Sequence, residues 1–301
     1  MRVPVPLNVG DKAVIVSPSG WIDDYVVGDA VSVLEDWGLI VDVANHALER
    51  NGRFAGTVDG RLEDIQKAFD DKNVRLVLCS RGGYGVVQLL DRLRFGGIRR
   101  YPKWVIGYSD ITALHAGLQR HGIASIHGPM ARHMSDEGAD DVSVRMLKSM
   151  VAGQRLRYEV PTKDDFYDLN RRGKASGRLF GGNLAVLCGL MGTRFFNVPR
   201  GGILVIEDIG EEPYKVDRML RQLDLAGVFR RIGGLIVGQF VGYDEDEQMD
   251  SPLYEMISGI VEKYKFPVCF NFPIGHVKLN FPVLMGDVGT LLVEKDFSYL
   301  Y

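Results

Sequence analysis

The sequence has little cysteine and no recurring metal-ligand motif. Only three cysteines, Cys79, Cys188 and Cys269, occur among 301 residues, and each stands singly among apolar neighbours. This usage excludes a disulfide framework and gives no zinc pattern. The six histidines include no His-x-x-x-His pair, so a helical metal-binding motif is absent as well. No metal site is expected.

The charge balance and the shortness of the apolar runs exclude two further classes of partner. Lys and Arg number 36 against 39 Asp and Glu, a net charge of −3, so no basic surface for nucleic acid is expected. Apolar stretches such as residues 235–237 are too short to span a bilayer. Residues 1–6 lack the apolar core of a signal peptide. We expect a cytoplasmic protein with no nucleic-acid or membrane partner.

The first half alternates short apolar runs with helical patterns, which is typical of βαβ units. Strands are expected at residues 13–16, 39–43, 75–79, 104–107 and 123–127. Their continuous apolar character predicts strands covered on both faces, and therefore a mostly parallel sheet. Ligands of such sheets bind beyond the carboxyl ends of the strands. The loops that fall there are residues 17–20, 80–85, 108–110 and 127–129.

A polar, irregular segment separates the two halves. It lies between about residues 151 and 176 and contains the charged run Lys163-Asp164-Asp165. This composition predicts a linker, 151–176, between an N-terminal domain, 1–150, and a C-terminal domain, 177–301.

The second half also carries strand and helix patterns. Strands are expected at residues 203–206, 235–239 and 268–271, with a closing pair at 283–285 and 290–293. After Pro213, the residues Val216, Met219, Leu220 and Leu223 follow helical spacing and predict a helix with one core-facing side.

The most informative segment is Gly107-Tyr108-Ser109-Asp110-Ile111-Thr112, between an expected strand and an expected helix. A serine at such a bend can expose its hydroxyl as a nucleophile, beside helix N–H groups that stabilise an oxyanion. Ile111 stands where the usual nucleophile elbow has glycine. Ser109 is also a favoured helix N-cap residue, and Asp110 suits a first turn, so both interpretations stay open.

A serine nucleophile needs a base within hydrogen-bond reach. His115 fails on geometry, because six residues of helix rise about 9 Å and turn the side chain off the serine's face. His46 and His133 are expected in surface loops. Two candidates remain open: His127, which ends a strand, and His276, which follows a glycine.

The base in turn needs an orienting group, and the oxyanion needs donors. Glu207 and Asp208 both emerge from the apolar run 203–206, and either can orient the base. The cluster Gly82-Gly83-Tyr84-Gly85 has neither the glycine spacing of a dinucleotide site nor the lysine of a P-loop. Its alternatives are a plain tight turn or an oxyanion hole in which the N–H of Gly82 or Gly83 acts with that of Asp110.

Taken together, these segments resemble the LD-carboxypeptidases of peptidase family S66, the muramoyltetrapeptide carboxypeptidases. The resemblance covers nearly the whole length. It rests on residues 80–85 (SRGGYG), 106–112 (IGYSDIT), 127–130 (HGPM), 181–184 (GGNL), 206–208 (IED), 217–219 (DRM) and 275–276 (GH).

The family divides a Ser-Glu-His triad between its two domains. The resemblance implies Ser109 as nucleophile, His276 as base and Glu207, rather than the adjacent Asp208, as orienting carboxylate. It further implies a Rossmann-like or flavodoxin-like N-terminal domain with helices on both faces and a smaller, mixed β-rich α/β C-terminal domain. A homodimer without metal or cofactor is also implied.

The resemblance also implies the substrate. It would be a cytoplasmic murein tetrapeptide from cell-wall recycling, cut between the L-centre of a diamino acid and the terminal D-Ala. The planar guanidinium of Arg81 is a candidate partner for the substrate carboxylate, and Tyr84 is a second substrate-binding candidate.

Three other functions stay open. One is a self-immunity hydrolase that cuts an acyl bond of a peptide-nucleotide antibiotic, with Tyr84, Tyr108 or Tyr243 stacking on the base. The second is a non-catalytic small-ligand-binding protein in which Ser109 is only a helix cap. The third is an amidase with Cys79 as nucleophile.

Overall fold

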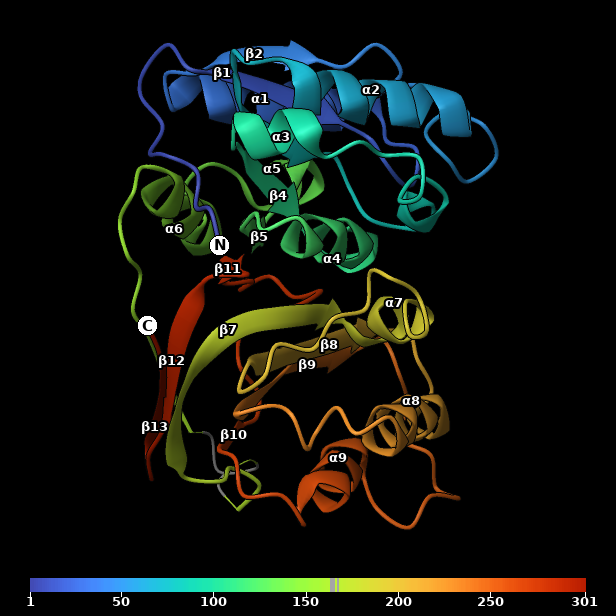
Figure 1. Cartoon of the computed structure of the whole chain (residues 1–301), viewed down its shortest axis with the longest axis vertical. Helices are drawn as coiled ribbons and strands as arrows, with labels where there is room; N and C mark the ends of the chain where they lie inside the picture. The colour runs from blue at the N-terminus through green and yellow to red at the C-terminus, as the bar shows by residue number, and fades with distance from the viewer. Residues whose placement is uncertain (163–165, 167) are drawn as a thin grey trace. The chain divides into compact units, whose positions relative to one another are not determined.

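The computed structural model describes residues 1–162, 166 and 168–301, which divide into two compact units. The first unit comprises Met1–Arg155 and Lys278–Gly286, and the second comprises Leu156–Val277 and Asp287–Tyr301. The chain therefore leaves the first unit, returns to it for a short segment, and ends in the second. Each unit has its own sheet (Figure 1).

The first unit is built on a six-stranded sheet in the order β11-β5-β4-β3-β1-β2. Neighbouring strands are parallel except for β11, which is antiparallel to β5. The elements are β1 (Lys12–Val16), α1 (Asp24–Asp36), β2 (Ile40–Val43), α2 (Val58–Asp70), β3 (Val74–Cys79), the 3₁₀ helix η1 (Val86–Gln88), α3 (Gly96–Arg100), β4 (Trp104–Gly107), the 3₁₀ turn η2 (Ser109–Ile111), α4 (Thr112–Arg120), β5 (Ser125–His127), α5 (Ala131–Glu137), α6 (Val142–Val151) and β11 (Val283–Met285). This confirms the mostly parallel α/β sheet.

Helices cover both faces of this sheet, as Figure 1 shows. Helix α1 packs against α5, and α2 packs against α3. Strands β1, β3, β4 and β5 are buried almost throughout, whereas β2 is an exposed edge strand. From β1 the chain runs outward to β2 and then back to β3 on the other side. Such a reversal of strand order is where open α/β sheets bind ligands.

The expected pairing of residues 283–285 with 290–293 is wrong. Residues 283–285 form β11, which adds to the first sheet with Val283 opposite His127. A Cβ added at Gly128 would lie 3.0 Å from the Cα of Pro282, so the absence of a side chain lets the returning segment pack there. Residues 290–293 instead belong to β12, which pairs with strands of the second unit.

The second unit contains a seven-stranded sheet in the order β10-β9-β8-β7-β12-β13-β6. Strands β7 to β10 are mutually parallel, and β7, β12, β13 and β6 are antiparallel. The elements are β6 (Tyr158–Pro161), β7 (Gly173–Asn183), α7 (Leu184–Gly189), β8 (Ile203–Ile209), α8 (Pro213–Leu225), β9 (Gly234–Val241), α9 (Leu253–Val261), β10 (Val268–Cys269), β12 (Val288–Val293) and β13 (Phe297–Leu300). This confirms the mixed, β-rich sheet.

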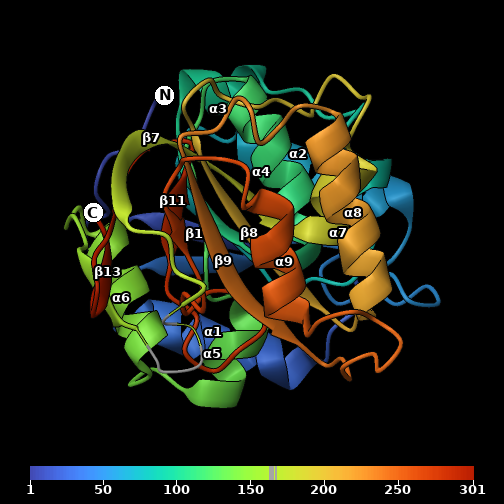
Figure 2. The same ribbon diagram turned by 90° about the horizontal axis from the view of Figure 1, so that it is seen from below.

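Strand β7 belongs to both halves of this sheet and is long and curved (Figure 1). Residues 173–178 pair with antiparallel β12 and alternate in burial, while residues 179–183 pair with parallel β8 and are buried throughout. The difference follows from covering, because helices α7, α8 and α9 pack on the parallel half (Figure 2). The expected helix after Pro213 is α8, with Val216, Leu220 and Leu223 buried.

The expected linker at 151–176 contains regular structure. Strand β6 and the first residues of β7 lie within it, and both belong to the second unit. Their polar side chains alternate with half-buried ones, as in a strand with one solvated face. The charged run at 163–165 lies outside the described residues.

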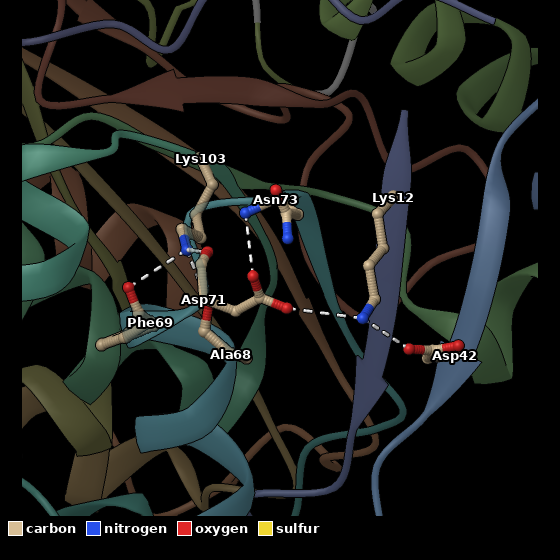
Figure 3. A network of polar contacts seen from close by, with 7 residues as sticks. All are labelled: Lys12, Asp42, Ala68, Phe69, Asp71, Asn73 and Lys103. Atoms are coloured by element: carbon tan, nitrogen blue, oxygen red, sulfur yellow. Dashed lines mark hydrogen bonds and ion pairs between the residues drawn. The ribbon is translucent and has the colours of Figure 1, made fainter. Parts of the chain in front are cut away.

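A polar network joins the amino ends of the strands in the first unit (Figure 3). Buried Lys103, just before β4, donates to the carbonyl oxygens of Ala68, Phe69 and Asp71 at 2.7, 3.1 and 2.7 Å. The Asp71 carboxylate accepts from Asn73 N and from Lys12 Nζ.

Among the described residues, none of the helices has the length and apolarity that crossing a bilayer requires.

Candidate active site

Ser109 lies in a strained backbone conformation directly after β4. Its φ is +64°, in the left-handed region that a residue with a side chain rarely adopts, and it opens the 3₁₀ turn η2. This conformation costs about 1–2 kcal/mol and persists only where the surroundings enforce it. The N-cap position of η2 is Tyr108, so the interpretation of Ser109 as a helix N-cap is wrong. Its side chain is half-buried at the carboxyl end of the sheet.

Gly82 lies directly against Ser109. A Cβ added at Gly82 would be 2.6 Å from the Cβ of Ser109, 2.7 Å from its Oγ and 3.5 Å from Asp110 N. Only glycine allows the loop after β3 to come this close to the hydroxyl. Gly83, with φ +122°, faces the loop after β1, where an added Cβ would lie 3.4 Å from Gly20 N. The structure thus brings Gly82 and Asp110 beside Ser109.

The Asp110 side chain joins the loops around Ser109. Its Oδ2 accepts from Ser19 Oγ at 2.6 Å and from Val86 N at 2.9 Å, which links the loops after β1 and β3. Burial raises the pKa of this carboxyl, and the hydrogen bonds and the charge of Arg61 oppose that rise. Asp110 therefore has a structural role in addition to the backbone N–H that the sequence pointed to.

The two predicted substrate-binding residues lie on the same loop as Gly82. Arg81 is half-buried and its Nη1 donates to Trp21 O at 3.3 Å. Tyr84 is 46% exposed, and its ring centroid lies 5.9 Å from that of Phe54. Both side chains are therefore at the carboxyl edge of the first sheet.

In the second unit, Glu207 and His276 form a pair. Glu207 lies on β8 and is fully buried, and its Oε2 is 2.8 Å from His276 Nδ1. A carboxylate only accepts, so Nδ1 carries the proton and a neutral imidazole then has its lone pair on Nε2. Gly275 has φ +125°, and a Cβ there would lie 2.9 Å from the same Oε2. The glycine before the histidine is thus required for this contact.

The loop that carries His276 is held by β9. Gln239 N donates to Ile274 O at 3.0 Å, and the Gln239 side chain donates to the backbone and side-chain oxygens of Asn271. Asn271 has φ +57°, which ends β10 after two residues instead of the four that the sequence predicted.

Asp208 is occupied elsewhere. Adjacent residues of a strand point to opposite faces, and Asp208 Oδ1 accepts from Asn183 Nδ2 while its Oδ2 accepts from Ala185 N at the start of α7, both at 2.8 Å. Burial and the neighbouring Glu207 raise the pKa of Asp208 to about 6. Of the two carboxylates that the sequence left open, Glu207 is the one in contact with His276.

Three other histidines, His115, His127 and His133, have structural surroundings. His115 is buried, with Nδ1 2.8 Å from Ser125 Oγ and Nε2 2.8 Å from Gly107 O, and burial lowers its pKa to about 4. His127 is buried in β5, with its ring near those of Tyr108 and His115. The expectation of a surface loop is wrong for His133, which is buried in α5 with Asp141 3.2 Å away.

Cys79 does not suit the role of nucleophile that the third alternative gave it, whereas Tyr243 is only partly buried. Cys79 is fully buried at the end of β3, and burial raises the pKa of its thiol, which disfavours the nucleophilic thiolate. The Tyr243 hydroxyl donates to Glu245 at 3.2 Å, and its ring packs against the core of the second unit.

Sequence reasoning missed two polar residues, Ser19 and Arg61, that make hydrogen bonds from or to the loops after β1 and β3 and interact with Asp110. Ser19 could have been predicted, because residues 17–20 follow β1 and were expected at the same sheet edge. The burial of Arg61 could not have been predicted, because an arginine in an amphipathic helix normally lies on the solvated side of the helix. Here Arg61 is 1% exposed.

The first unit thus holds a strained serine beside close glycine backbone, and the second unit holds a Glu–His pair. Both are residue types that serine hydrolases use. Comparison with known proteins identifies the family. Residues 14–128 match the model of the LD-carboxypeptidase N-terminal domain, and residues 176–291 match that of the LD-carboxypeptidase C-terminal domain.

Curated relatives match over nearly their full length. The probable murein peptide carboxypeptidase of Bacillus subtilis is 34% identical, covering 94% of this chain and 89% of the relative. The murein tetrapeptide carboxypeptidase of Pseudomonas aeruginosa is 32% identical, covering 90% of each.

Solved structures share the fold. Muramoyltetrapeptide carboxypeptidase from Oxalobacter formigenes has a TM-score of 0.87 at 28% identity, covering 96% of this chain and 97% of that one. An MccF-like protein from Bacillus anthracis has a TM-score of 0.87 at 26% identity, covering 100% and 99%. The chain belongs to the LD-carboxypeptidase family, peptidase family S66, and is a peptide-bond hydrolase of the serine peptidase class.

Proposed function

We propose that this chain is a murein tetrapeptide carboxypeptidase that removes the terminal D-Ala through Ser109, His276 and Glu207. The observation that carries the proposal is the 2.8 Å contact between Glu207 Oε2 and His276 Nδ1. Gly275 leaves room for this contact, because a Cβ at position 275 would lie 2.9 Å from the same Oε2. The names of the relatives from Bacillus and Pseudomonas support the substrate class. The proposal includes action in the cytoplasm, during cell-wall recycling, as a homodimer.

The proposed chemistry is an acyl transfer in two steps. His276 Nε2 takes the proton of the Ser109 hydroxyl as its oxygen attacks the carbonyl carbon before D-Ala, while Glu207 stabilises the imidazolium. The protonated imidazole then gives its proton to the leaving nitrogen, D-Ala departs, and water hydrolyses the acyl-enzyme by the same route. The N–H groups of Gly82 or Gly83 and of Asp110 hold the oxyanion, where one donor is worth on the order of 10²–10³ in rate.

The test is release of D-Ala from purified murein tetrapeptide, followed by mass spectrometry. Wild-type protein should release one D-Ala per peptide, and Ser109→Ala should not. A Ser109→Ala variant with undiminished turnover, or a wild type inactive on every L,D-peptide, would refute the proposal.

A second candidate is hydrolysis of an acyl bond in a peptide-nucleotide, favoured by the MccF-like neighbour. Tyr84, which is exposed and whose ring lies 5.9 Å from that of Phe54, is one aromatic side chain suited to stack on a base at the edge of the first sheet. Wild-type rates on murein tetrapeptide and on an aminoacyl-sulfamoyl nucleoside, measured side by side, separate the two. A higher kcat/KM on the nucleoside would favour this candidate.

The proposal assigns the substrate carboxylate to Arg81, because a free C-terminus requires a cation or N–H groups for recognition. A tetrapeptide amidated at D-Ala should then lose most of its kcat/KM, and Arg81→Met should reduce the rate on the acid but not on the amide. Equal rates of the wild type on both substrates would contradict this assignment.

A further inference from the structure

Arg61 is a buried cation in the first turn of α2. Its Nη1 donates to Pro18 O at 2.8 Å in the loop after β1, and its Nη2 donates to Gln88 Oε1 at 2.7 Å in η1. Its guanidinium carbon lies 4.8 Å from the centroid of the Phe54 ring. One side chain thus joins the loops that follow β1 and β3.

The position of Arg61 is unfavourable for a cation. The amino end of a helix carries a partial positive charge, so a guanidinium in the first turn is repelled. Within the part of the chain that the structure describes, Arg61 Nε is buried and has no hydrogen-bond acceptor. Burial lowers the pKa of this guanidinium, and Asp110 opposes the effect. A cation buried in this unfavourable position, with one donor unsatisfied, requires a compensating interaction or a functional explanation.

The compensation comes from Asp110, the residue after Ser109. The Asp110 carboxylate is buried and accepts from Ser19 and Val86, in the same two loops that Arg61 joins. A buried carboxylate without a nearby cation would be driven towards its neutral form, which has less capacity to accept hydrogen bonds. The two charges therefore stabilise each other beneath the loops around Ser109.

The spacing at Ser109 depends on these loops. Gly20 N donates to Gly82 O at 3.3 Å, and Gly82 has no free space towards Ser109. Gly85 is equally close to Arg61, because an added Cβ would collide with its Nη1. A small shift of either loop would consequently move the N–H groups beside the nucleophile, and catalysis is sensitive to displacements of about 1 Å.

We propose that Arg61 is a positioning residue for acylation of Ser109: with Asp110, it fixes the loops after β1 and β3 so that the backbone N–H groups at Gly82 and Asp110 stay aimed at the developing oxyanion. The inference rests on the proposed function, and it adds to that function a residue that does not touch substrate. It predicts a loss in kcat with little change in KM, because the oxyanion develops in the transition state and the tetrahedral intermediate and is absent from the bound substrate.

The experiment compares four variants of the full chain on murein tetrapeptide: Arg61→Met, Arg61→Lys, Asp110→Asn and the Arg61→Met/Asp110→Asn double variant. The concentration of active sites comes from endpoint titration with a fluorophosphonate, so unfolded protein does not count. Arg61→Met should lower kcat by about 10–10²-fold at nearly constant KM, less than the loss of a whole oxyanion donor. Arg61→Lys keeps the charge but not the two separate donors, so its kcat should lie between those of Arg61→Met and the wild type.

The double variant and a matched control distinguish positioning from general loss of structure. If Arg61 and Asp110 act as a unit, the double variant should be no slower than the slower single variant. Lys103→Met removes a second buried cation, which contacts the carboxyl end of α2 opposite the end that carries Arg61, and should leave kcat per active site unchanged.

Three outcomes would overturn the inference: wild-type kcat in Arg61→Met, fully additive losses in the double variant, or an equal kcat loss in Lys103→Met. If Arg61→Met does not fold, Arg61→Lys and Asp110→Asn still decide, since wild-type kcat in both would also overturn it. Ser109→Ala, measured in parallel, tests the proposed function itself: full turnover there refutes that function whatever the Arg61 variants do.

Discussion

A buried cation lies at each end of helix α2, but the helix dipole favours only one of the two. At the carboxyl end of the helix, Lys103 donates to three carbonyl oxygens, where the helix dipole favours a positive charge (Figure 3). At the amino end, Arg61 lies where the dipole disfavours it. The hydrogen bonds of Lys103 account for its position by stabilising the fold. The position of Arg61 has no such explanation, and Arg61 is the cation that interacts with Asp110, the residue after Ser109.

The same contrast runs across the first sheet. At its amino edge, Asp71 forms an ion pair with Lys12 through its carboxylate and accepts a hydrogen bond from Lys103 through its carbonyl oxygen. At its carboxyl edge, Ser109 has a strained backbone and Gly82 has no room for a side chain. Strain gathers at functional sites and is tolerated because the surrounding fold is stable. The comparison therefore predicts that changes at the carboxyl edge affect turnover, and changes at the amino edge affect stability.

The largest effect is expected from removing the Ser109 hydroxyl. Ser109→Ala should lower kcat on murein tetrapeptide by about 10⁴–10⁶, because residual rate comes only from binding and the oxyanion donors. Its unfolding free energy should stay close to wild type, since the hydroxyl is half-buried and its loss leaves no cavity. A loss of stability in place of turnover, measured by urea denaturation, would break the comparison.

A smaller loss of turnover is expected when a methyl group is added at Gly82. In Gly82→Ala the new Cβ would lie 2.7 Å from Ser109 Oγ, so either the loop or the nucleophile must move. We expect kcat to fall by about 10²-fold, the effect of misplacing one oxyanion donor. Gly28→Ala is the control, because Gly28 lies in α1 with nothing within 4 Å of an added Cβ. Equal kcat in the two variants would contradict the tight fit at Gly82.

At the other edge, Lys103→Met should act on stability alone. It leaves three carbonyl oxygens without their donor, and we expect a loss of about 1–3 kcal/mol in unfolding free energy at neutral pH. Wild-type kcat per active site should persist. A kcat loss comparable to that of Gly82→Ala would show that the two edges are not independent.

The pH dependence of stability sharpens the same point. Burial lowers the pKa of Lys103 to about 8 from an ordinary value of 10.5. Between these two values the unfolded chain holds the proton and the folded protein has lost it, so the unfolding free energy should rise with pH over that interval. Denaturation curves of Lys103→Met should lack this rise. A rise of equal size in wild type and variant would assign it to another group.

The smallest expected effect concerns the strain at Ser109. Ser109→Gly and Ser109→Ala both lack the hydroxyl, but glycine adopts a φ near +64° without the steric cost. The relief of this steric cost exceeds the entropic cost of glycine in the unfolded chain. The net result should be that Ser109→Gly is about 0.5–1 kcal/mol more stable than Ser109→Ala. A Ser109→Gly protein that is less stable than Ser109→Ala by the full entropic cost of glycine would mean that Ser109 is not strained.

Much of the fold was predictable because the signal is local. Continuous apolar runs located the strands of the first sheet, and helical spacing after Pro213 located α8. The pairing of residues 283–285 was not predictable in this way. Two strands joined by a Gly-Asp turn resemble a hairpin, whereas the packing of Pro282 on Gly128 is a contact between segments far apart in the sequence.

The candidate site shows the same limit. Loop positions after parallel strands pointed to Ser109, Gly82 and Asp110, and the glycine before His276 marked a sharp turn. To choose Glu207 over Asp208, one must know to which face of β8 each side chain points. A shift of one residue in register would reverse these directions, and the sequence does not specify the register. The buried position of Arg61 was beyond sequence reasoning, because the charge that balances it lies 49 positions along the chain at Asp110.

The central claim is that Glu207 and His276 activate Ser109, and the most direct test is the rate at which a fluorophosphonate labels the protein. Mass spectrometry should place the label on Ser109. Glu207→Gln should slow labelling by on the order of 10²–10⁴, as expected when the carboxylate that orients the base becomes an amide. Asp208→Asn should label at nearly the wild-type rate. Label on another residue, or a Glu207→Gln protein that reacts as fast as wild type, would contradict the account.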